Sequence, residues 1–152
     1  MPIKLLAFVA KHINGVRFMK GLCLCGAIEV STNDQNKVDV CHCSMCRRWS
    51  GGPMFAVHCG PNVSFSGTQK PTTYRSSDWA ERGFCPSCGT HLFYHLIPAN
   101  EYILSAGLFN DDTHFEMRSQ IFIDHKPNHY EFANETPTLT EEQVFAKYSQ
   151  GQ

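Results

Sequence analysis

Short runs of β-branched, aromatic and other apolar residues follow one another along most of the chain after Gly21. Gly, Pro and Asn residues separate these runs, and such residues favour turns between strands. The run at 102–106, for example, is rich in residues that pack well on a pleated sheet. This pattern predicts strands at residues 27–32, 54–59, 62–67, 72–75, 91–96, 102–108 and 120–124. The fold class that we expect is therefore mainly β.

Two helical segments interrupt the β pattern. A short helix is predicted at residues 44–50, directly after a group of cysteines. A second helix is predicted at the C-terminal end, where Thr140 precedes two glutamates and a glutamine and so provides an N-cap with a capping box. In that helix Val144, Phe145 and Tyr148 would form a buried stripe.

The length and charge of the chain narrow its class. A chain of 152 residues suits one domain that buries roughly two-thirds of the surface its unfolded form exposes. With 13 Lys and Arg against 14 Asp and Glu, the formal charge is -1, so the broad basic field of a nucleic-acid-binding protein is absent. The apolar stretch at 3–10 is too short to span a bilayer. We expect neither nucleic acid nor membrane as a partner.

Seven of the eight cysteines fall into three tight groups, which are Cys23 with Cys25, Cys41 with Cys43 and Cys46, and Cys85 with Cys88. Such spacing allows neighbouring thiolates to converge on one ion, and the sequence therefore predicts a zinc protein. A disulfide scaffold is the alternative, but such scaffolds are usually shorter and poorer in core residues. We accordingly expect a cytoplasmic, reduced protein.

The two pairs of cysteines suit a closed site. Cys85-Pro-Ser-Cys88-Gly89 has the form of a knuckle, in which a tight turn aims two sulfurs inward. The one-residue spacer between Cys23 and Cys25 places both sulfurs on one strand face. Because four thiolates complete a tetrahedral zinc site, these four residues are expected to hold a structural zinc.

The group Cys41, Cys43 and Cys46 suits an open site, because three thiolates leave one position of a tetrahedral zinc free for a substrate. The predicted helix at 44–50 would favour a thiolate near its N-terminus. A substrate thiol in the free position would become a nucleophile at neutral pH. These three cysteines are therefore the candidate catalytic residues, and two zinc ions per chain are expected.

Several residues near the clusters leave alternatives open. His42 could close the second site, although neighbours on an extended backbone point to opposite faces, so it is more readily an orienting or solvent-facing residue. Cys59 lies in an apolar run and is expected to be a buried free thiol. Either His91 or His95 could approach the site, whereas the remaining histidines, including His58, are expected to be ordinary surface or core residues.

Three ordered motifs make the chain similar to a known family: Gly21-Leu-Cys23-Leu-Cys25-Gly26, Cys41-His-Cys43-Ser-Met-Cys46-Arg47-Arg48-Trp49-Ser50-Gly51 and Arg82-Gly-Phe84-Cys85-Pro-Ser-Cys88-Gly89-Thr90. They resemble the glutathione-dependent formaldehyde-activating enzyme family, which includes centromere protein V. The likeness runs from about residue 19 to about residue 132. It divides the chain into an N-terminal extension at 1–18, a zinc-binding domain of this family at 19–133, and a connector with the C-terminal helix at 134–152.

The resemblance implies a β-tent, in which small antiparallel sheets lean together around a structural zinc. It assigns Cys23, Cys25, Cys85 and Cys88 to that zinc, and the three other clustered cysteines to a catalytic zinc. The implied reaction is that of a carbon–sulfur lyase of the S-(hydroxymethyl)glutathione synthase type, which adds glutathione or a related thiol to formaldehyde or another small aldehyde. Cys43, flanked by the other two ligands, is the one expected to leave the metal when the thiol enters.

The substrate-binding candidates are Arg47, Arg48 and Trp49, which directly follow the three-cysteine group. Their arginines could attract the carboxylates of glutathione, as could Arg75 and Arg82, although a solvated helix face would explain the first two equally well. Two other classes remain open. The chain could be a noncatalytic zinc-binding interaction module, or a thiol redox sensor that uses the same reactive thiolates.

Overall fold

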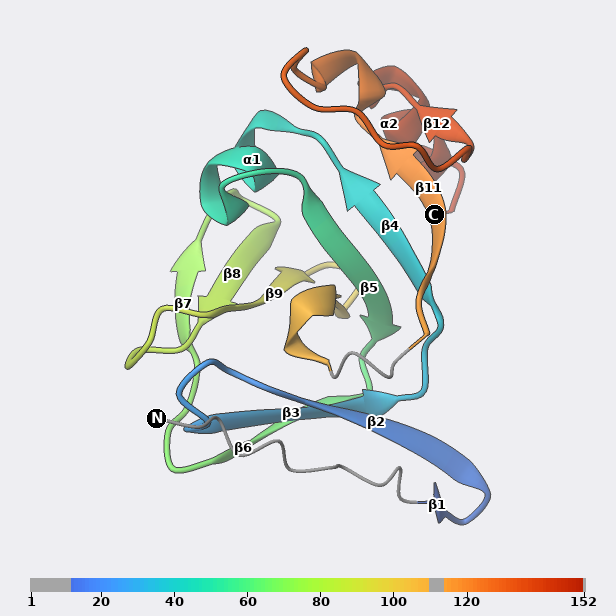
Figure 1. The fold of residues 1–152 in the computed structure, drawn as a ribbon. Coiled ribbons are helices and arrows are strands. Elements are labelled where there is room, and N and C mark those ends of the chain that lie inside the picture. Colours follow the sequence, from blue (N-terminus) through green and yellow to red (C-terminus); the bar gives the residue numbers. More distant parts are fainter. Residues whose placement is uncertain (1–11, 110–113, 152) are drawn as a thin grey trace.

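The computed structural model describes residues 12–109 and 114–151, whose strands form two sheets (Figure 1). The smaller sheet has four antiparallel strands in the order β1-β2-β3-β6. Its strands are β1 (His12–Ile13), β2 (Val16–Leu22), β3 (Ile28–Asn33) and β6 (Val63–Gly67). In Figure 1 this sheet crosses the bottom of the molecule.

The larger sheet has eight strands in the order β12-β11-β4-β5-β10-β9-β8-β7. They are β4 (Lys37–Cys41), β5 (Met54–Gly60), β7 (Thr72–Arg75), β8 (Ala80–Phe84), β9 (His91–Leu96), β10 (Glu101–Ser105), β11 (Glu116–Ile121) and β12 (Thr138–Leu139). Strand β11 runs parallel to both of its neighbours, and the other pairs are antiparallel. The strands lean over the smaller sheet, and the predicted mainly β fold is confirmed (Figure 1).

Both expected helices are present, at the end of the molecule opposite the smaller sheet (Figure 1). They are α1 (Ser44–Ser50) and α2 (Glu141–Ser149), and two short 3-10 helices, η1 (Ala106–Leu108) and η2 (Ile123–His125), complete the described elements. Thr140 and Gln143 form the predicted capping box of α2. Of the expected stripe, Val144 is buried, but Phe145 and Tyr148 are about half exposed, so that part of the prediction is wrong.

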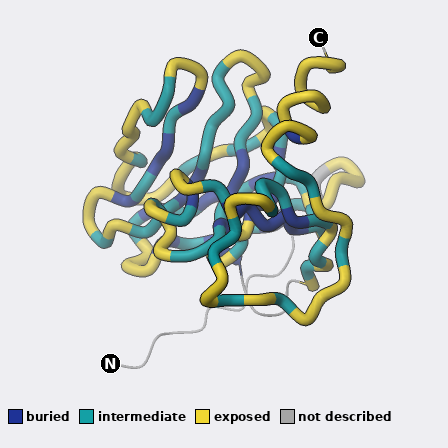
Figure 2. Tube along the Cα trace, turned by 90° about the horizontal axis from the view of Figure 1, so that it is seen from above, coloured by how far each residue is buried: buried dark blue, intermediate teal, exposed yellow. Residues whose placement is uncertain are grey.

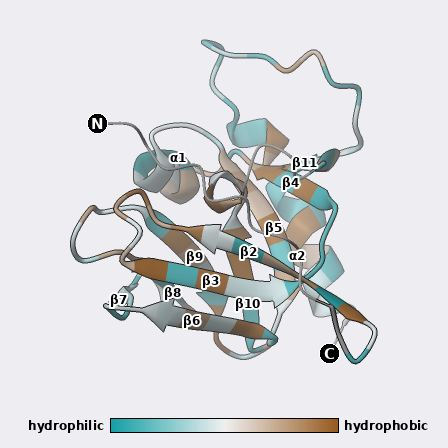
Figure 3. Ribbon diagram, turned by 60° about the horizontal axis from the view of Figure 1, so that its bottom comes forward, coloured by the Kyte–Doolittle hydropathy of each residue, from teal (hydrophilic) through white to brown (hydrophobic). Residues whose placement is uncertain are grey.

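The main core lies between the sheets. Alternate residues of β3 are buried, among them Ile28 and Val30, and they pack with Val57, Leu92 and Leu104 of the larger sheet. Figure 3 shows the matching alternation of hydrophobic and hydrophilic residues at the start of β3, and Figure 2 shows buried segments in mid-strand with exposed loops around them. This packing holds β4, β5 and β8 in place, which are the strands next to the cysteine groups.

A close approach between β2 and η1 explains one glycine. A Cβ atom on Gly21 would lie only 2.7 Å from the backbone oxygen of Leu108. The isolated bridge between Gly21 and Phe109 joins β2 to the segment after η1 at this point. Gly21 therefore allows the chain that precedes the first cysteine pair to lie directly against η1 and the residue that follows it.

The sequence placed most strands correctly and some wrongly. Strands β7 and β9 have the predicted bounds, whereas the run at 102–108 leaves the sheet at Ser105 and ends as η1. The strand predicted at 120–124 is β11, which ends at Ile121 because Phe122 has a left-handed φ of 54°. Strands β2, β4 and β8 were not predicted, since polar residues, glycine or cysteine break their apolar alternation.

Strand β2 begins at Val16 and therefore crosses the division expected between residues 18 and 19. Strand β12 and helix α2 belong to the segment expected as connector and C-terminal helix, and β12 pairs with β11 of the larger sheet. The division of the chain into three parts stays a prediction. In the described part of the chain, neither helix is long and apolar enough to cross a membrane.

Candidate metal centres

The sulfurs of Cys23, Cys25, Cys85 and Cys88 converge to within 4.8 Å of one another. The Cys23 and Cys25 sulfurs are 3.6 Å apart, and those of Cys25 and Cys85 are 3.8 Å apart. A tetrahedral zinc with bonds to sulfur of about 2.3 Å requires sulfur–sulfur edges of roughly 3.8 Å. The four side chains therefore fit a zinc ion in geometry as well as in donor type, and none of the eight cysteines forms a disulfide.

Two tight turns aim these sulfurs inward. The Gly26 N–H donates to the Cys23 carbonyl, and the Gly89 N–H donates to the Cys85 carbonyl. The Ile28 N–H donates to the Cys23 sulfur, at 3.3 Å. Burial opposes ionisation of Cys88, but hydrogen bonds from the Thr90 hydroxyl and backbone outweigh it and hold the pKa of this thiol down at about 5. Cys88 is thus favoured as a thiolate, whereas contacts with the other cysteines contribute to a raised pKa of about 11 at Cys25.

Thr90 connects the two halves of this cluster. Its hydroxyl oxygen is 3.1 Å from the Cys88 sulfur and accepts a hydrogen bond of 3.0 Å from the Leu24 N–H. Leu24 lies between the first two cysteines, sixty-six positions away along the chain. The segment after β2 and the knuckle after β8 are therefore joined by protein contacts that do not depend on an ion.

The sulfurs of Cys41, Cys43 and Cys46 also lie within 4.8 Å of one another. Cys41 is the last residue of β4, Cys43 is the N-cap of α1, and Cys46 is in its first turn. The Cys43 sulfur accepts a hydrogen bond from the Cys46 N–H at 3.3 Å. Contacts with the Cys41 and Cys46 thiols lower the pKa of Cys43 to about 2, and the contact with Cys43 raises that of Cys41. The pKa of Cys46 is raised as well, so negative charge is favoured at Cys43, where it suits a cation.

His42 does not join this cluster. Its ring is fully buried on the other side of the backbone, 2.9 Å from the Gln120 amide oxygen and 2.8 Å from the Tyr130 hydroxyl. Since the amide oxygen can only accept, Nε2 donates to Gln120 and Nδ1 accepts from Tyr130. Burial lowers the pKa of His42 and favours this neutral form. The interpretation of His42 as a fourth ligand or a solvent-facing residue is wrong.

Arg82 of β8 was expected among the partners of a substrate carboxylate, but the structure places it elsewhere. Its side chain is 5% exposed, and the two terminal nitrogens lie 3.8 and 3.7 Å from the Cys46 sulfur. Its guanidinium carbon is 4.9 Å from the centre of the Trp49 ring and 5.1 Å from that of Tyr94. Arg82 is thus a buried cation against the three-cysteine cluster.

The other substrate-binding candidates differ in exposure. Trp49 is partly buried and stacks on His91, with ring centres 4.2 Å apart, so His91 is the histidine that approaches this site. Arg47 is partly buried, and its Nε donates to the His42 carbonyl at 2.9 Å. Arg48 is exposed. Their roles in binding a substrate stay predictions.

A group of charged side chains beside the cluster was missed by the sequence analysis. The buried carboxylate of Asp39, two residues before Cys41 on β4, pairs with the guanidinium of Arg118 and accepts from the Ser119 hydroxyl at 2.7 Å. His58 lies 3.4 Å from Asp39 and 2.7 Å from Glu101. An aspartate between two valines, just before the three-cysteine group, would have been the signal.

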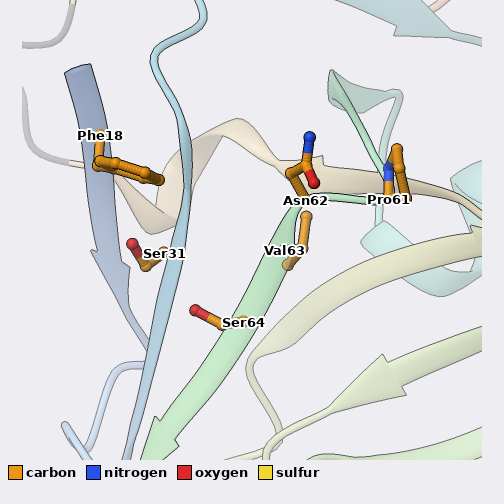
Figure 4. A pocket seen from close by; sticks show the side chains of 6 residues that line it. All are labelled: Phe18, Ser31, Pro61, Asn62, Val63 and Ser64. Carbon is orange, nitrogen blue, oxygen red and sulfur yellow. The ribbon is translucent and has the colours of Figure 1, made fainter. Parts of the chain in front are cut away.

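The remaining cysteine and a surface depression carry no such chemistry. Cys59 is buried, as predicted, and burial raises the pKa of its thiol to about 11. The depression, of about 360 Å³, is lined by Phe18, Ser31, Pro61, Asn62, Val63 and Ser64 of the smaller sheet and its approach (Figure 4). Neither cysteine cluster contributes to it.

The fold and the two clusters define a mainly β protein with one group of four convergent cysteines and one group of three. The model of the family described as glutathione-dependent formaldehyde-activating enzyme matches residues 18–125. An uncharacterised lyase of Schizosaccharomyces pombe is 37% identical over 127 residues, which are 82% of this chain and 93% of the yeast protein. The chain therefore belongs to the glutathione-dependent formaldehyde-activating enzyme family, as the motifs indicated.

A solved structure has a similar fold. The crystal structure of a Rhodobacter sphaeroides protein is 25% identical in sequence and superposes with a TM-score of 0.53. The match covers 61% of this chain and 89% of the bacterial one. The similarity thus includes the arrangement of the backbone over the matched part of the chain.

Proposed function

We propose that the protein is a zinc-dependent enzyme of the carbon–sulfur lyase type, which joins glutathione or a related thiol to formaldehyde or another small aldehyde. The observation that carries this proposal is the three-cysteine cluster, whose convergent sulfurs are one ligand short of a closed tetrahedral site. Membership of the family named for glutathione and formaldehyde supports the choice of substrates.

The two clusters would have separate roles. Cys23, Cys25, Cys85 and Cys88 would hold a structural zinc, and Cys41, Cys43 and Cys46 would hold a catalytic one. When bound at the second cluster, zinc supplies an exchangeable position that lowers the pKa of an incoming thiol and holds it as a thiolate. Residues of the chain would then bind and orient the substrate around that position.

In the proposed reaction the thiol sulfur forms a bond to the carbonyl carbon of the aldehyde, and the carbonyl π bond breaks. The proton lost by the thiol ends on the former carbonyl oxygen, so the product is a hydroxymethyl thioether and no oxidant or reductant is consumed. Arg47 and Arg48 would bind the carboxylates of glutathione, and Trp49 would form part of the wall. Bringing the two reactants together accounts for a large share of the acceleration in such bimolecular steps.

A thiol redox sensor is the second candidate, and one observation favours it. Cys43 is partly exposed and has a pKa lowered to about 2 by its two neighbouring cysteines, and exposed thiolates are the ones that oxidants attack. Zinc loading would protect these thiolates. A redox-sensor function therefore requires that the three-cysteine cluster be metal-free and oxidisable when the protein acts.

The rate of adduct formation tests the enzyme proposal. The adduct of glutathione and formaldehyde also forms without catalyst, so exchange NMR would compare the rate with and without protein. The zinc-loaded wild type should accelerate exchange, and the Cys46→Ser variant should not. A rate equal to that of the buffer, with both metals in place, would contradict the proposal for this substrate pair.

A further inference from the structure

Arg82 is a buried cation in an unusual setting. Within the described residues no carboxylate forms a salt bridge with its guanidinium, which contacts the Cys46 sulfur through two nitrogens. The Trp49 and Tyr94 rings lie within about the same distance of the guanidinium, at 4.9 and 5.1 Å. Aromatic faces attract a cation, but they carry no net charge to balance it.

Burial of an unbalanced charge is costly, so a cation that is 95% buried requires a negative partner. Here the nearest candidate is the Cys46 sulfur, which belongs to a cluster of three cysteines and would be a thiolate when that cluster holds zinc. Three thiolates and one divalent cation leave one negative charge in excess. The single positive charge of Arg82 balances that excess.

We infer that Arg82 is the counter-ion of the three-cysteine site and shifts its ligand preference toward an anionic fourth ligand, a thiolate, relative to a neutral one. Without Arg82, four thiolates and one divalent cation would leave a net charge of -2 in a poorly solvated place. With Arg82 the net charge is -1. This inference rests on the proposed function, since it concerns the position where the substrate thiol would bind.

The surroundings hold the Arg82 side chain in this position. Its neighbours Ala80 and Gly83 on β8 are buried, and its guanidinium faces α1 through Trp49. Burial and the positive charge of Arg82 also lower the pKa of His91, which stacks on Trp49. A fixed charge of this kind needs no rearrangement when an anion arrives. Arg82 is therefore a positioning residue that acts through the site's charge.

Ligand binding to cobalt-substituted protein tests the inference, because thiolate and imidazole both alter the visible spectrum of cobalt. Wild type and Arg82→Met would be titrated with 2-mercaptoethanol and with imidazole. Loss of one charge-assisted interaction predicts thiol binding weaker by roughly ten- to a hundredfold. Imidazole affinity should change by less than about threefold, since its binding adds no charge.

Three variants complete the test. Arg82→Gln is a second neutral variant and should bind both ligands as Arg82→Met does. It replaces Arg82→Met in the test if that variant does not fold. Arg82→Lys keeps the charge and should retain the preference for the thiol. Arg17→Met removes an exposed arginine that pairs with Asp34 on the smaller sheet, and should bind both ligands as wild type does. Chelator competition on each variant measures cobalt affinity independently of ligand binding.

Equal weakening of both ligands in the neutral variants would overturn the inference, because Arg82 would then only support the structure. Unchanged thiol affinity would overturn it as well. If wild-type cobalt protein showed no spectral change with 2-mercaptoethanol, the proposed thiol-binding function would itself fail. If the wild-type spectrum changes with 2-mercaptoethanol and the Arg82 variants bind this thiol equally well, the thiol-binding function is supported and the role of Arg82 is not.

Discussion

At the scale of single residues, different neighbours distinguish the two cysteine clusters. The Thr90 hydroxyl lies against the Cys88 sulfur of the four-cysteine cluster, and a neutral hydrogen-bond donor suffices there. The three-cysteine cluster has the charged guanidinium of Arg82 against Cys46. These contacts agree with a closed site that only holds structure and an open site that must accept a further ligand.

Arg47 is the best-placed candidate for a substrate carboxylate, because its Nε is held by the His42 carbonyl next to the cluster. Replacing Arg47 by Ala should weaken glutathione binding by roughly ten- to a hundredfold, the effect of one charge-assisted contact. Binding of 2-mercaptoethanol, which has no carboxylate, should not change. Calorimetric titration would measure both, with Arg17→Ala as the control, and an unchanged glutathione affinity would exclude Arg47 from the site.

Gly83 is a residue whose replacement should damage the fold. A Cβ atom there would lie 2.2 Å from the Phe93 ring, which is packed in the core. Gly83→Ala should therefore lower the free energy of unfolding by about 1–3 kcal/mol. Gly52→Ala meets no atom within 4 Å and serves as the control in urea unfolding. Equal stability of the two variants would show that the sheet adjusts freely around Phe93.

At the scale of elements, the sequence predicts what depends on local spacing. The spacing within each of the three cysteine groups and the capping box of α2 were read from positions a few residues apart, and both appear in the structure. The joining of the two cysteine pairs was inferred from the number of thiolates that close a zinc site. The contacts of Arg82 and His42 could not be read in this way. They depend on which strands lie side by side in the larger sheet, and strands β4 and β8 were themselves not predicted.

The two clusters should differ in what is lost when one cysteine is replaced. Cys85→Ser should misfold or melt early, because loss of a closed structural site removes folding free energy. Cys46→Ser should stay folded and lose only the second metal. Thermal unfolding together with elemental analysis would measure both, with wild type at two zinc ions per chain. Equal stability and solubility of the two variants would leave the structural and catalytic roles without support.

At the scale of the whole molecule, strand β8 connects the two clusters. Arg82 in its middle contacts Cys46, and Cys85 directly follows its last residue. Order in the four-cysteine cluster should therefore hold the counter-ion of the other cluster in place. The charged group around Asp39 has a similar position on β4, which ends at Cys41.

That charged group makes stability depend on pH. A hydrogen bond from His58 lowers the pKa of Glu101, and bonds from Arg118 and Ser119 outweigh burial and lower that of Asp39. Carboxyls with a lowered folded pKa stabilise the protein above their unfolded values, about 4. That stability is lost as the pH falls through the folded values.

Glu101→Gln should therefore lose stability at pH 7 and show a smaller fall in stability than wild type between about pH 5 and the acid limit. Urea unfolding across this range would measure it. Glu116→Gln, at an exposed ion pair with Lys37, is the matched control and should follow wild type. Identical pH profiles for wild type and Glu101→Gln would show that His58 does not stabilise this carboxylate.

The most direct test of the proposed function is whether a thiol sulfur enters the three-cysteine metal site. Cobalt-substituted protein would be titrated with glutathione and with S-methylglutathione, which has the same charges but a blocked sulfur. Bands from thiolate to cobalt report the bond directly. If the thiol sulfur binds the metal, the spectrum should change with glutathione and should not change with S-methylglutathione. The same change with both compounds, or no change with either, would contradict it.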